Sequence, residues 1–344
     1  MVKKRMKAPR KTPAFAQAGK IILSALSAPS PASPQRPDLK IDWLGKFNLV
    51  DSVRGKTIPL RITYPTEPGH YPVVIFSHGA GNSKDGYRFL VRHWARAGYI
   101  CLQPSHDDSI DLLRLKHNVP DLMALAMQAT GDPVFWLSRV KDIEHIIASF
   151  STLAAKLPAG VTMDEKTVAI AGHSFGSFTT QCLAGVTPDI PPGVIPGLSG
   201  PTSFANAVPR AFVMFSPQGV HTPGLGFPSH AAWANMHRPA IVIGGSLDNG
   251  LQGQPARWRT EPFKYSPAGD KYLLFVNGAD HMTCAGKPLT AAASANGHDL
   301  FAYMALATRS FLDAYLKGDS AAKQTLIDHD LDKQSGGVAE QDHR

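Results

Sequence analysis

The stretch from Thr167 to Gly185, TVAIAGHSFGSFTTQCLAG, constrains the fold more than any other part of the chain. It begins with a short apolar run that predicts a buried strand and continues with small and apolar residues that predict a helix. Ser174 stands where the one becomes the other, between Gly172 and Gly176. A strand that turns sharply into a helix through one residue strains that residue and leaves no room for side chains beside it. We therefore predict that the Ser174 hydroxyl is exposed at a strand end, beside the N–H groups and positive dipole end of a helix.

Continuous apolar runs alternate with helical patterns along the chain, which predicts an α/β fold with a mostly parallel central sheet and helices on both faces. An antiparallel hairpin around Arg54-Gly55 is expected to come first. The clearest helix begins with Asp132 as its N-cap and Pro133 in its first turn. The predicted buried strands are YPVVIFS, YICLQP, TVAIAG, AFVMFSP, AIVIGG and KYLLFVNG, and further helices are expected at about 85–97, after Ser174 and at 300–318.

The first forty residues differ in charge from the rest of the 344-residue chain. Eight basic residues and one acidic residue stand between Met1 and Asp38, so the remainder is close to neutral although the formal charge of the whole chain is +8. A nearly neutral body argues against a nucleic-acid-binding surface. No stretch beyond these residues approaches the roughly 20 apolar residues of a transmembrane helix.

The order of segments within these forty residues predicts domain boundaries. A basic start, the short apolar run IILSALSA and a Pro/Ser-rich stretch resemble a secretory signal followed by a linker. This favours a secreted or periplasmic protein over a cytoplasmic one, and a disordered basic tail is the alternative. We expect this segment over residues 1–40, one α/β domain over 41–320 and a polar C-terminal tail over 321–344.

Two further residues are predicted to make Ser174 reactive, because a serine hydroxyl is a poor nucleophile without a base that a third group orients. His281, in LLFVNGADHMTCAG, lies just beyond the last apolar strand and is the predicted base, with His298 as the second choice. Asp248, in IVIGGSLDNG, lies just past the preceding strand and is the predicted acid. Asp280 adjoins the base and is interpreted as a solvated or loop-ordering residue.

Acyl transfer also requires two N–H donors for the oxygen that becomes negative, the oxyanion hole. The N–H of Phe175, which follows the nucleophile, is the first predicted donor. The second is expected in the glycine-rich stretch FSHGAG after an earlier strand, and by position it is the N–H of Ala80. A phosphate-binding loop is the alternative for this stretch, but GAGNSKDG lacks the spacing of a P-loop.

These motifs together resemble the α/β-hydrolases: Ser-His-Gly-Ala-Gly after one strand, Gly-His-Ser-Phe-Gly after another, and then Asp248 and His281. The resemblance runs from about Val53 to about Leu316. Within the superfamily the chain is similar to the dienelactone-hydrolase-like and platelet-activating-factor acetylhydrolase-like group, which includes bacterial polyester hydrolases. Dienelactone hydrolases use cysteine as nucleophile, so Ser174 favours ester hydrolysis. The acetylhydrolase-like enzymes can carry the acid one strand earlier, but FVMFSPQG has no acid there, which favours Asp248.

The function that these residues predict is hydrolysis of carboxylic esters through an acyl-enzyme, on a small-molecule, lipid or polymer ester and without a metal or organic cofactor. A serine peptidase or acyltransferase on the same fold is the enzymatic alternative. A non-catalytic hydrolase-fold binding protein is the alternative from another class. Met282, Trp136 and Tyr87 are candidate substrate contacts, although Trp136 is on a periodic helix and is more often a core residue. The segment from 186 to 209 is a candidate lid.

Weaker signals are interpreted structurally. His106, Asp107 and Asp108 have metal-ligand side chains, but adjacent ligands seldom converge on one ion, so a polar loop at the mouth of a pocket is expected. Arg139 and Asp142 on one helix are expected to make a surface or capping interaction. The three cysteines, Cys101, Cys182 and Cys284, form no CxxC motif, and the first two are expected to be small core residues.

Overall fold

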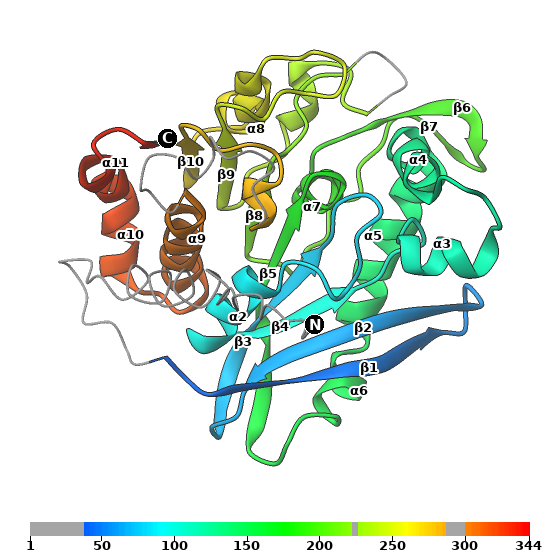
Figure 1. Ribbon diagram of the computed structural model, residues 1–344, viewed down its shortest axis with the longest axis horizontal. Helices are drawn as coiled ribbons and strands as arrows, with labels where there is room; N and C mark the ends of the chain where they lie inside the picture. The colour runs from blue at the N-terminus through cyan, green and yellow to red at the C-terminus, as the bar shows by residue number, and fades with distance from the viewer. Residues whose placement is uncertain (1–37, 222–225, 287–299) are drawn as a thin grey trace, which may run out of the picture.

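One nine-stranded sheet forms the centre of the computed structural model, which describes residues 38–221, 226–286 and 300–344 (Figure 1). Its strand order is β1-β2-β4-β3-β5-β8-β9-β10-β11. Neighbouring strands from β4 to β10 run parallel, whereas β1 and β2 at one edge and β11 at the other are antiparallel to their neighbours. The strands of this sheet are β1 (Ile41–Asp51), β2 (Lys56–Pro65), β3 (Gly69–Ser77), β4 (Ile100–Pro104), β5 (Val161–His173), β8 (Ala211–Phe215), β9 (Ala240–Gly245), β10 (Lys271–Val276) and β11 (Ala339–His343).

Helices cover both faces of this sheet, which confirms the predicted α/β-hydrolase architecture (Figure 1). Side chains alternate along β3, so that Val73 and Ile75 pack with α5 and α7, while Val74 and Phe76 pack with α2 and α9 on the other face. The helices are α2 (Arg88–Arg96), α3 (Ile110–Lys116), α4 (Leu122–Gln128), α5 (Pro133–Ala148), α6 (Phe150–Ala154), α7 (Phe175–Ala184), α8 (Glu261–Tyr265), α9 (Leu300–Leu316), α10 (Ser320–Ile327) and α11 (Asp330–Ser335), with 3₁₀ turns at Ala129–Gly131, His230–Trp233, Ala256–Thr260 and Thr283–Ala285.

The predicted start of α5 is confirmed in detail. Asp132 accepts a hydrogen bond from the backbone N–H of Val134 at 2.8 Å, and Pro133 occupies the first turn. An N-cap carboxylate satisfies one of the backbone donors that a helix start leaves open. The cap therefore fixes where α5 begins, and with it which residues of α5 face the end of the sheet.

The C-terminal segment differs from the sequence prediction. Residues 321–344 were expected to form a polar tail, but α10 and α11 fold back and β11 pairs antiparallel with β10 at the edge of the sheet. An edge strand needs backbone hydrogen bonds more than apolar side chains, so the polar sequence AEQDH gave no signal of it.

Two excursions from the central sheet contain elements of their own. The first, after β4, contains α3 and α4. The second contains a separate two-stranded hairpin, β6 (Asp189–Ile195) and β7 (Leu198–Pro201). Residues 1–37 of the predicted leader segment over residues 1–40 lie outside the described residues, as does the second-choice base His298.

Three smaller expectations can be compared with the described part of the chain. Cys101, Cys182 and Cys284 are buried free thiols, which confirms the interpretation of the first two as core residues. No helix in this part is long and apolar enough to cross a membrane. Nor do His, Cys, Asp and Glu side chains gather there into a group that could hold a metal ion.

Candidate active site

Ser174 occupies the strand-to-helix turn between β5 and α7 with a strained backbone, at φ 54° and ψ −118°. Non-glycine residues rarely adopt such angles, which cost on the order of 1–3 kcal/mol. A Cβ atom at Gly176 would collide with the carbonyl oxygen of Ser77, and one at Gly172 would collide with the carbonyl group of Gly176. The Ser174 N–H donates to the Phe215 carbonyl at 3.0 Å, which ties the turn to β8. Both glycines are therefore needed for this turn.

His281 and Asp248 form a hydrogen-bonded pair at the same edge of the sheet. His281 Nδ1 donates to Asp248 Oδ1 at 2.9 Å, and the two residues follow β10 and β9. The Asp248 side chain is fully buried, whereas 32% of the His281 side chain is exposed. A buried carboxylate that holds an exposed imidazole is the arrangement expected of an acid that orients a base.

His173 links Ser174 to the loop that carries His281. Its ring lies against the His281 ring, with centroids 4.6 Å apart, and its Nε2 donates to the His281 carbonyl oxygen at 2.9 Å. No hydrogen bond joins Ser174 Oγ to the His281 ring among the described residues. Such bonds are often long in an enzyme without substrate. The predicted base is thus tied to the residue that directly precedes Ser174.

Tyr87 continues this link to the glycine-rich loop after β3. Burial lowers the pKa of His173 to about 3, so the ring is neutral. Since its Nε2 donates to a carbonyl, its Nδ1 must accept, here from the Tyr87 hydroxyl at 2.9 Å. The Tyr87 oxygen in turn accepts from the Gly79 N–H at 3.0 Å. The hydroxyl of this predicted substrate contact is therefore already used inside the protein.

Asp248 has two partners that sequence reasoning missed. The Ser216 hydroxyl donates to Oδ2 at 2.5 Å, and Arg259 Nη2 lies 3.0 Å from Oδ1. Burial alone would raise the pKa of Asp248, but the His281 hydrogen bond and the Arg259 charge outweigh it and hold the pKa at about 2. Ser216 directly follows β8, the strand after which no acid was found, so the hydroxyl-bearing residue in SPQG was the available signal. Arg259, one of two arginines in ARWRT, gave no such signal.

Ala80 and Phe175 carry the two predicted oxyanion donors. The neighbouring N–H groups are taken: Gly79 donates to Tyr87, and Gly81 donates to Asp108 at 3.3 Å. Neither Ala80 nor Phe175 donates its N–H to an acceptor among the described residues. A Cβ atom at Gly79 would lie 3.4 Å from the Ser174 Cβ, so this loop passes close to the serine. The arrangement suits two donors aimed at one oxygen beside Ser174.

The other predicted site residues lie in different surroundings. Trp136 is 1% exposed, packs against Phe178 and donates its indole N–H to the Thr130 carbonyl, which makes it a core residue. Met282 is partly buried in the loop directly after His281. Asp280 accepts from the N–H and hydroxyl of Thr283 at 2.7 and 2.8 Å, as expected of a loop-ordering residue.

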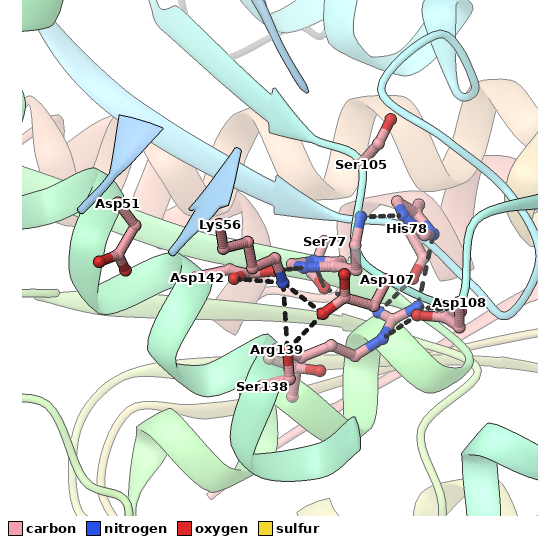
Figure 2. Close-up of polar contacts among 12 residues, drawn as sticks. Asp51, Lys56, Ser77, His78, Ser105, Asp107, Asp108, Ser138, Arg139 and Asp142 are labelled. Atoms are coloured by element: carbon pink, nitrogen blue, oxygen red, sulfur yellow. Dashed lines mark hydrogen bonds and ion pairs between the residues drawn. The ribbon is translucent and has the colours of Figure 1, made fainter. Parts of the chain in front are cut away.

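Polar residues that were expected near the surface are instead buried and contact one another in a cluster (Figure 2). His106 and Asp108 are 0% exposed, Asp142 is 0% exposed and Arg139 is 1% exposed. The interpretation of His106–Asp108 as a polar loop at the mouth of a pocket was therefore wrong. The interpretation of Arg139 and Asp142 as a surface or capping pair was wrong for the same reason. The polar face of α5 packs against the loops that follow β3 and β4, so it points its charges inward rather than to solvent.

A second Ser–His–Asp chain runs through this cluster. His106 Nδ1 donates to Asp142 Oδ2 at 2.9 Å, which leaves Nε2 to accept from the Ser77 hydroxyl at 3.0 Å. Lys56 and Arg54 approach the other oxygen of Asp142 at 2.8 and 2.9 Å. All three members of the chain are 0% exposed, so no substrate reaches Ser77.

The comparisons with known proteins agree with this fold. The model of the chlorophyllase family matches residues 46–187, which contain Ala80 and Ser174 but neither Asp248 nor His281. Chlorophyllase-1 of Arabidopsis thaliana is 31% identical over 126 residues, which are 37% of this chain and 32% of that protein. The chain thus matches about a third of the length of this curated relative. Both matches are to esterases of the α/β-hydrolase type, and neither supports the narrower dienelactone-hydrolase-like resemblance.

Proposed function

We propose that the protein is a serine hydrolase of carboxylic esters. The observation that carries this proposal is the strained Ser174 turn at the same sheet edge as the buried Asp248 and its hydrogen-bonded, half-exposed partner His281. The similarity to chlorophyllases over residues 46–187 supports it independently for the segment that carries Ser174.

The proposed reaction assigns one step to each group. His281 takes the proton of Ser174 as its oxygen attacks the ester carbonyl, and then gives that proton to the leaving alcohol. Asp248 keeps the imidazole oriented and stabilises its charged form. The Ala80 and Phe175 N–H groups stabilise the oxyanion. Water, activated by His281, then releases the acyl group from Ser174.

We propose an ester with a large apolar group as the substrate class. Leu115, Val119 and Met123 are 82%, 43% and 48% exposed on the excursion that contains α3 and α4. Met123 adjoins the loop after β3 that carries Ala80, since its Sδ would lie 3.1 Å from a Cβ atom placed at Gly81. The similarity to a protein named chlorophyllase makes chlorophyll one substrate to test, and a dienelactone-hydrolase-like or polyester-hydrolase-like specificity is the competing proposal.

Ester turnover by matched variants tests this function. Wild-type protein, Ser174→Ala and His281→Ala are compared on p-nitrophenyl esters from acetate to palmitate and on chlorophyll. We expect at least about a 1,000-fold loss of turnover in both variants. The control is His70→Ala, at a histidine whose side chain is 63% exposed near the start of β3. A folded wild-type protein that hydrolyses none of these esters would overturn the proposal, and faster cleavage of matched amides would favour the peptidase alternative.

A further inference from the structure

We infer that Arg139 and Asp108 are positioning residues that hold both donors of the oxyanion hole in place. This inference rests on the proposed ester hydrolysis for its role in catalysis, but its geometry stands on its own. The two side chains form a buried pair: Arg139 Nε donates to Asp108 Oδ1 at 2.9 Å and Nη2 donates to Oδ2 at 2.7 Å (Figure 2). Bidentate geometry of this kind fixes both partners in orientation as well as distance.

The Arg139–Asp108 pair forms hydrogen bonds to the loop after β3 on both sides of Ala80. Arg139 Nη1 donates to the carbonyl oxygen of His78 at 2.7 Å, two residues before Ala80. Asp108 Oδ2 accepts the N–H of Gly81 at 3.3 Å, the residue directly after it. The Gly79 N–H donates to Tyr87, so the backbone groups of His78, Gly79 and Gly81 named here all have hydrogen-bond partners. The N–H of Ala80 stays available for an oxyanion.

The same guanidinium also contacts the residue that carries the second donor. Arg139 Cζ lies 4.1 Å from the centre of the Phe175 ring, a cation–π distance. Phe175 is 1% exposed, so its ring packs between α7 and Arg139 rather than against solvent. One side chain therefore contacts the segments of both donors, which come from loops 95 residues apart in the sequence.

The surrounding cluster restrains the rest of the loop. The His78 ring donates from Nδ1 to the Gly79 carbonyl at 2.7 Å and accepts the His106 N–H on Nε2 at 2.9 Å. Ser77 also accepts from Arg139 Nη1, at 3.2 Å. The loop after β3 is thus fixed to the loop after β4 and to α5, and Arg139 of α5 contacts both loops.

A purely structural role for the pair predicts a different outcome from a positioning role. A stabilising ion pair would change the stability of the fold when weakened, but not the exchange of one loop or the affinity for a transition-state analogue. A positioning pair changes these local properties while the protein remains folded. The test therefore uses Arg139→Lys, which keeps the positive charge but cannot bind Asp108 in bidentate fashion and reach His78 at once.

Arg238→Lys is the matched control. Arg238 donates to the carbonyls of Asn206, Pro209 and Leu183 and stacks over the Phe212 ring at 4.7 Å. Like Arg139, it donates to backbone carbonyls and stacks on a phenylalanine ring. It precedes β9, however, and so lies at the amino ends of the parallel strands, whereas Ser174 lies at their carboxyl ends. Any effect common to both variants is a general effect of weakening a stacked arginine.

The first measurement is amide hydrogen exchange of the peptide that covers residues 77–82. We expect exchange to be at least about tenfold faster in Arg139→Lys than in wild type and unchanged in Arg238→Lys. Unchanged exchange in folded Arg139→Lys overturns the inference. This reading needs no enzymatic activity, so it decides the inference even if the wild-type protein hydrolyses no ester and the proposed function fails.

The second measurement applies the same variants to catalysis. We expect Arg139→Lys to lower kcat by about 10- to 100-fold with KM within about twofold, since loss of a whole oxyanion donor costs about 100- to 1,000-fold. The affinity for a trifluoromethyl ketone, which forms an oxyanion on Ser174, is expected to fall by the same factor, and the pH profile of kcat to keep its shape. Equal analogue affinity in wild type and Arg139→Lys contradicts the inference.

Asp108→Asn is the variant to use if Arg139→Lys does not fold. The amide keeps the shape of Asp108 and one acceptor oxygen, so the change is milder. We expect about a 3- to 10-fold loss of kcat, with faster exchange of residues 77–82 in the same direction. Wild-type exchange and wild-type kcat in folded Asp108→Asn would overturn the inference.

Discussion

The molecule contains two Ser–His–Asp chains whose hydrogen bonds are alike and whose surroundings are not. In one, Asp248 accepts from His281 at 2.9 Å beside Ser174; in the other, Asp142 accepts from His106 at 2.9 Å beside Ser77. The His281 side chain is 32% exposed, whereas the His106 side chain is fully buried. The same three residue types therefore appear once with a partly exposed histidine and once fully enclosed in the protein.

Backbone geometry separates the two serines further. Ser174 is held at φ 54° at the start of α7, next to unused N–H groups. Ser77 ends the regular strand β3, and its hydroxyl is enclosed by His106 and Arg139. A reactive serine thus requires a strained turn, donors for an oxyanion and access, in addition to a histidine and a carboxylate. We expect the buried chain to stabilise the fold rather than to react.

The largest expected difference is between substitutions of the two serines. Ser174→Ala should lower ester turnover by at least about 1,000-fold, because it removes the nucleophile. Ser77→Ala should lower kcat by less than about tenfold, because the buried hydroxyl meets no substrate. Steady-state kinetics on one p-nitrophenyl ester compare the two. A loss of turnover in Ser77→Ala as deep as that in Ser174→Ala would break the comparison.

The buried histidine should matter for stability rather than turnover. His106→Leu removes the acceptor for Ser77 and the donor to Asp142, and leaves a buried carboxylate with one partner fewer. We expect a loss of about 1–3 kcal/mol in the free energy of unfolding and less than a tenfold change in kcat. Urea unfolding and the same ester assay measure the two quantities. Wild-type stability in this variant would mean that the buried chain supports nothing.

Acid should destabilise the protein through these buried histidines. Burial lowers the pKa of His78 to about 4, that of His173 to about 3 and that of His106 well below its usual value. Unfolding restores a pKa near 6.5, so below that pH the unfolded chain binds more protons and the folded state loses stability. The contribution is complete above pH 6.5 and is lost as the pH falls toward 4 and below, by up to about 1.4 kcal/mol per pH unit for each histidine.

Urea unfolding at pH 7.5, 6 and 5 measures this slope. His106→Leu provides the control, because it removes one of these histidines and should flatten the slope by the contribution of that histidine. A free energy of unfolding that stays constant between pH 7.5 and 5 would show that these rings take up protons without unfolding.

The smallest expected effect concerns the extra partner of Asp248. Ser216→Ala removes the hydroxyl that donates to Oδ2, but leaves the bonds from His281 and Arg259. We expect kcat to fall by about two- to tenfold, consistent with a loss of about 0.5–1.5 kcal/mol for one hydrogen bond. Steady-state kinetics with KM measured separately provide the comparison. A loss as large as that of His281→Ala would place Ser216 within the catalytic group itself.

The sequence predicted the fold and the proposed triad for a physical reason. Buried parallel strands read as continuous apolar runs, and residues just past such strands meet at one edge of the sheet. Ser174, Asp248 and His281 each follow such a run, so their positions could be read in order. The glycines beside Ser174 marked the turn because no other residue fits there.

The buried cluster could not be predicted in the same way. Arg139 meets Asp108 and His78 only because α5 packs over two loops far away in the sequence, and helical spacing alone favoured a surface pair. Strand β11 escaped prediction because edge pairing depends on backbone hydrogen bonds and not on an apolar pattern. Local patterns thus identified the elements and their ends, while contacts between distant loops had to be seen in three dimensions.

Covalent labelling tests the central claim, that only one of the two Ser–His–Asp chains is reactive. The intact protein is treated with a fluorophosphonate and the modified residue is located by peptide mass spectrometry. The structure predicts a single adduct on Ser174, retained in Ser77→Ala and lost in Ser174→Ala. An adduct on Ser77, or no adduct on any serine of the folded protein, would contradict the account.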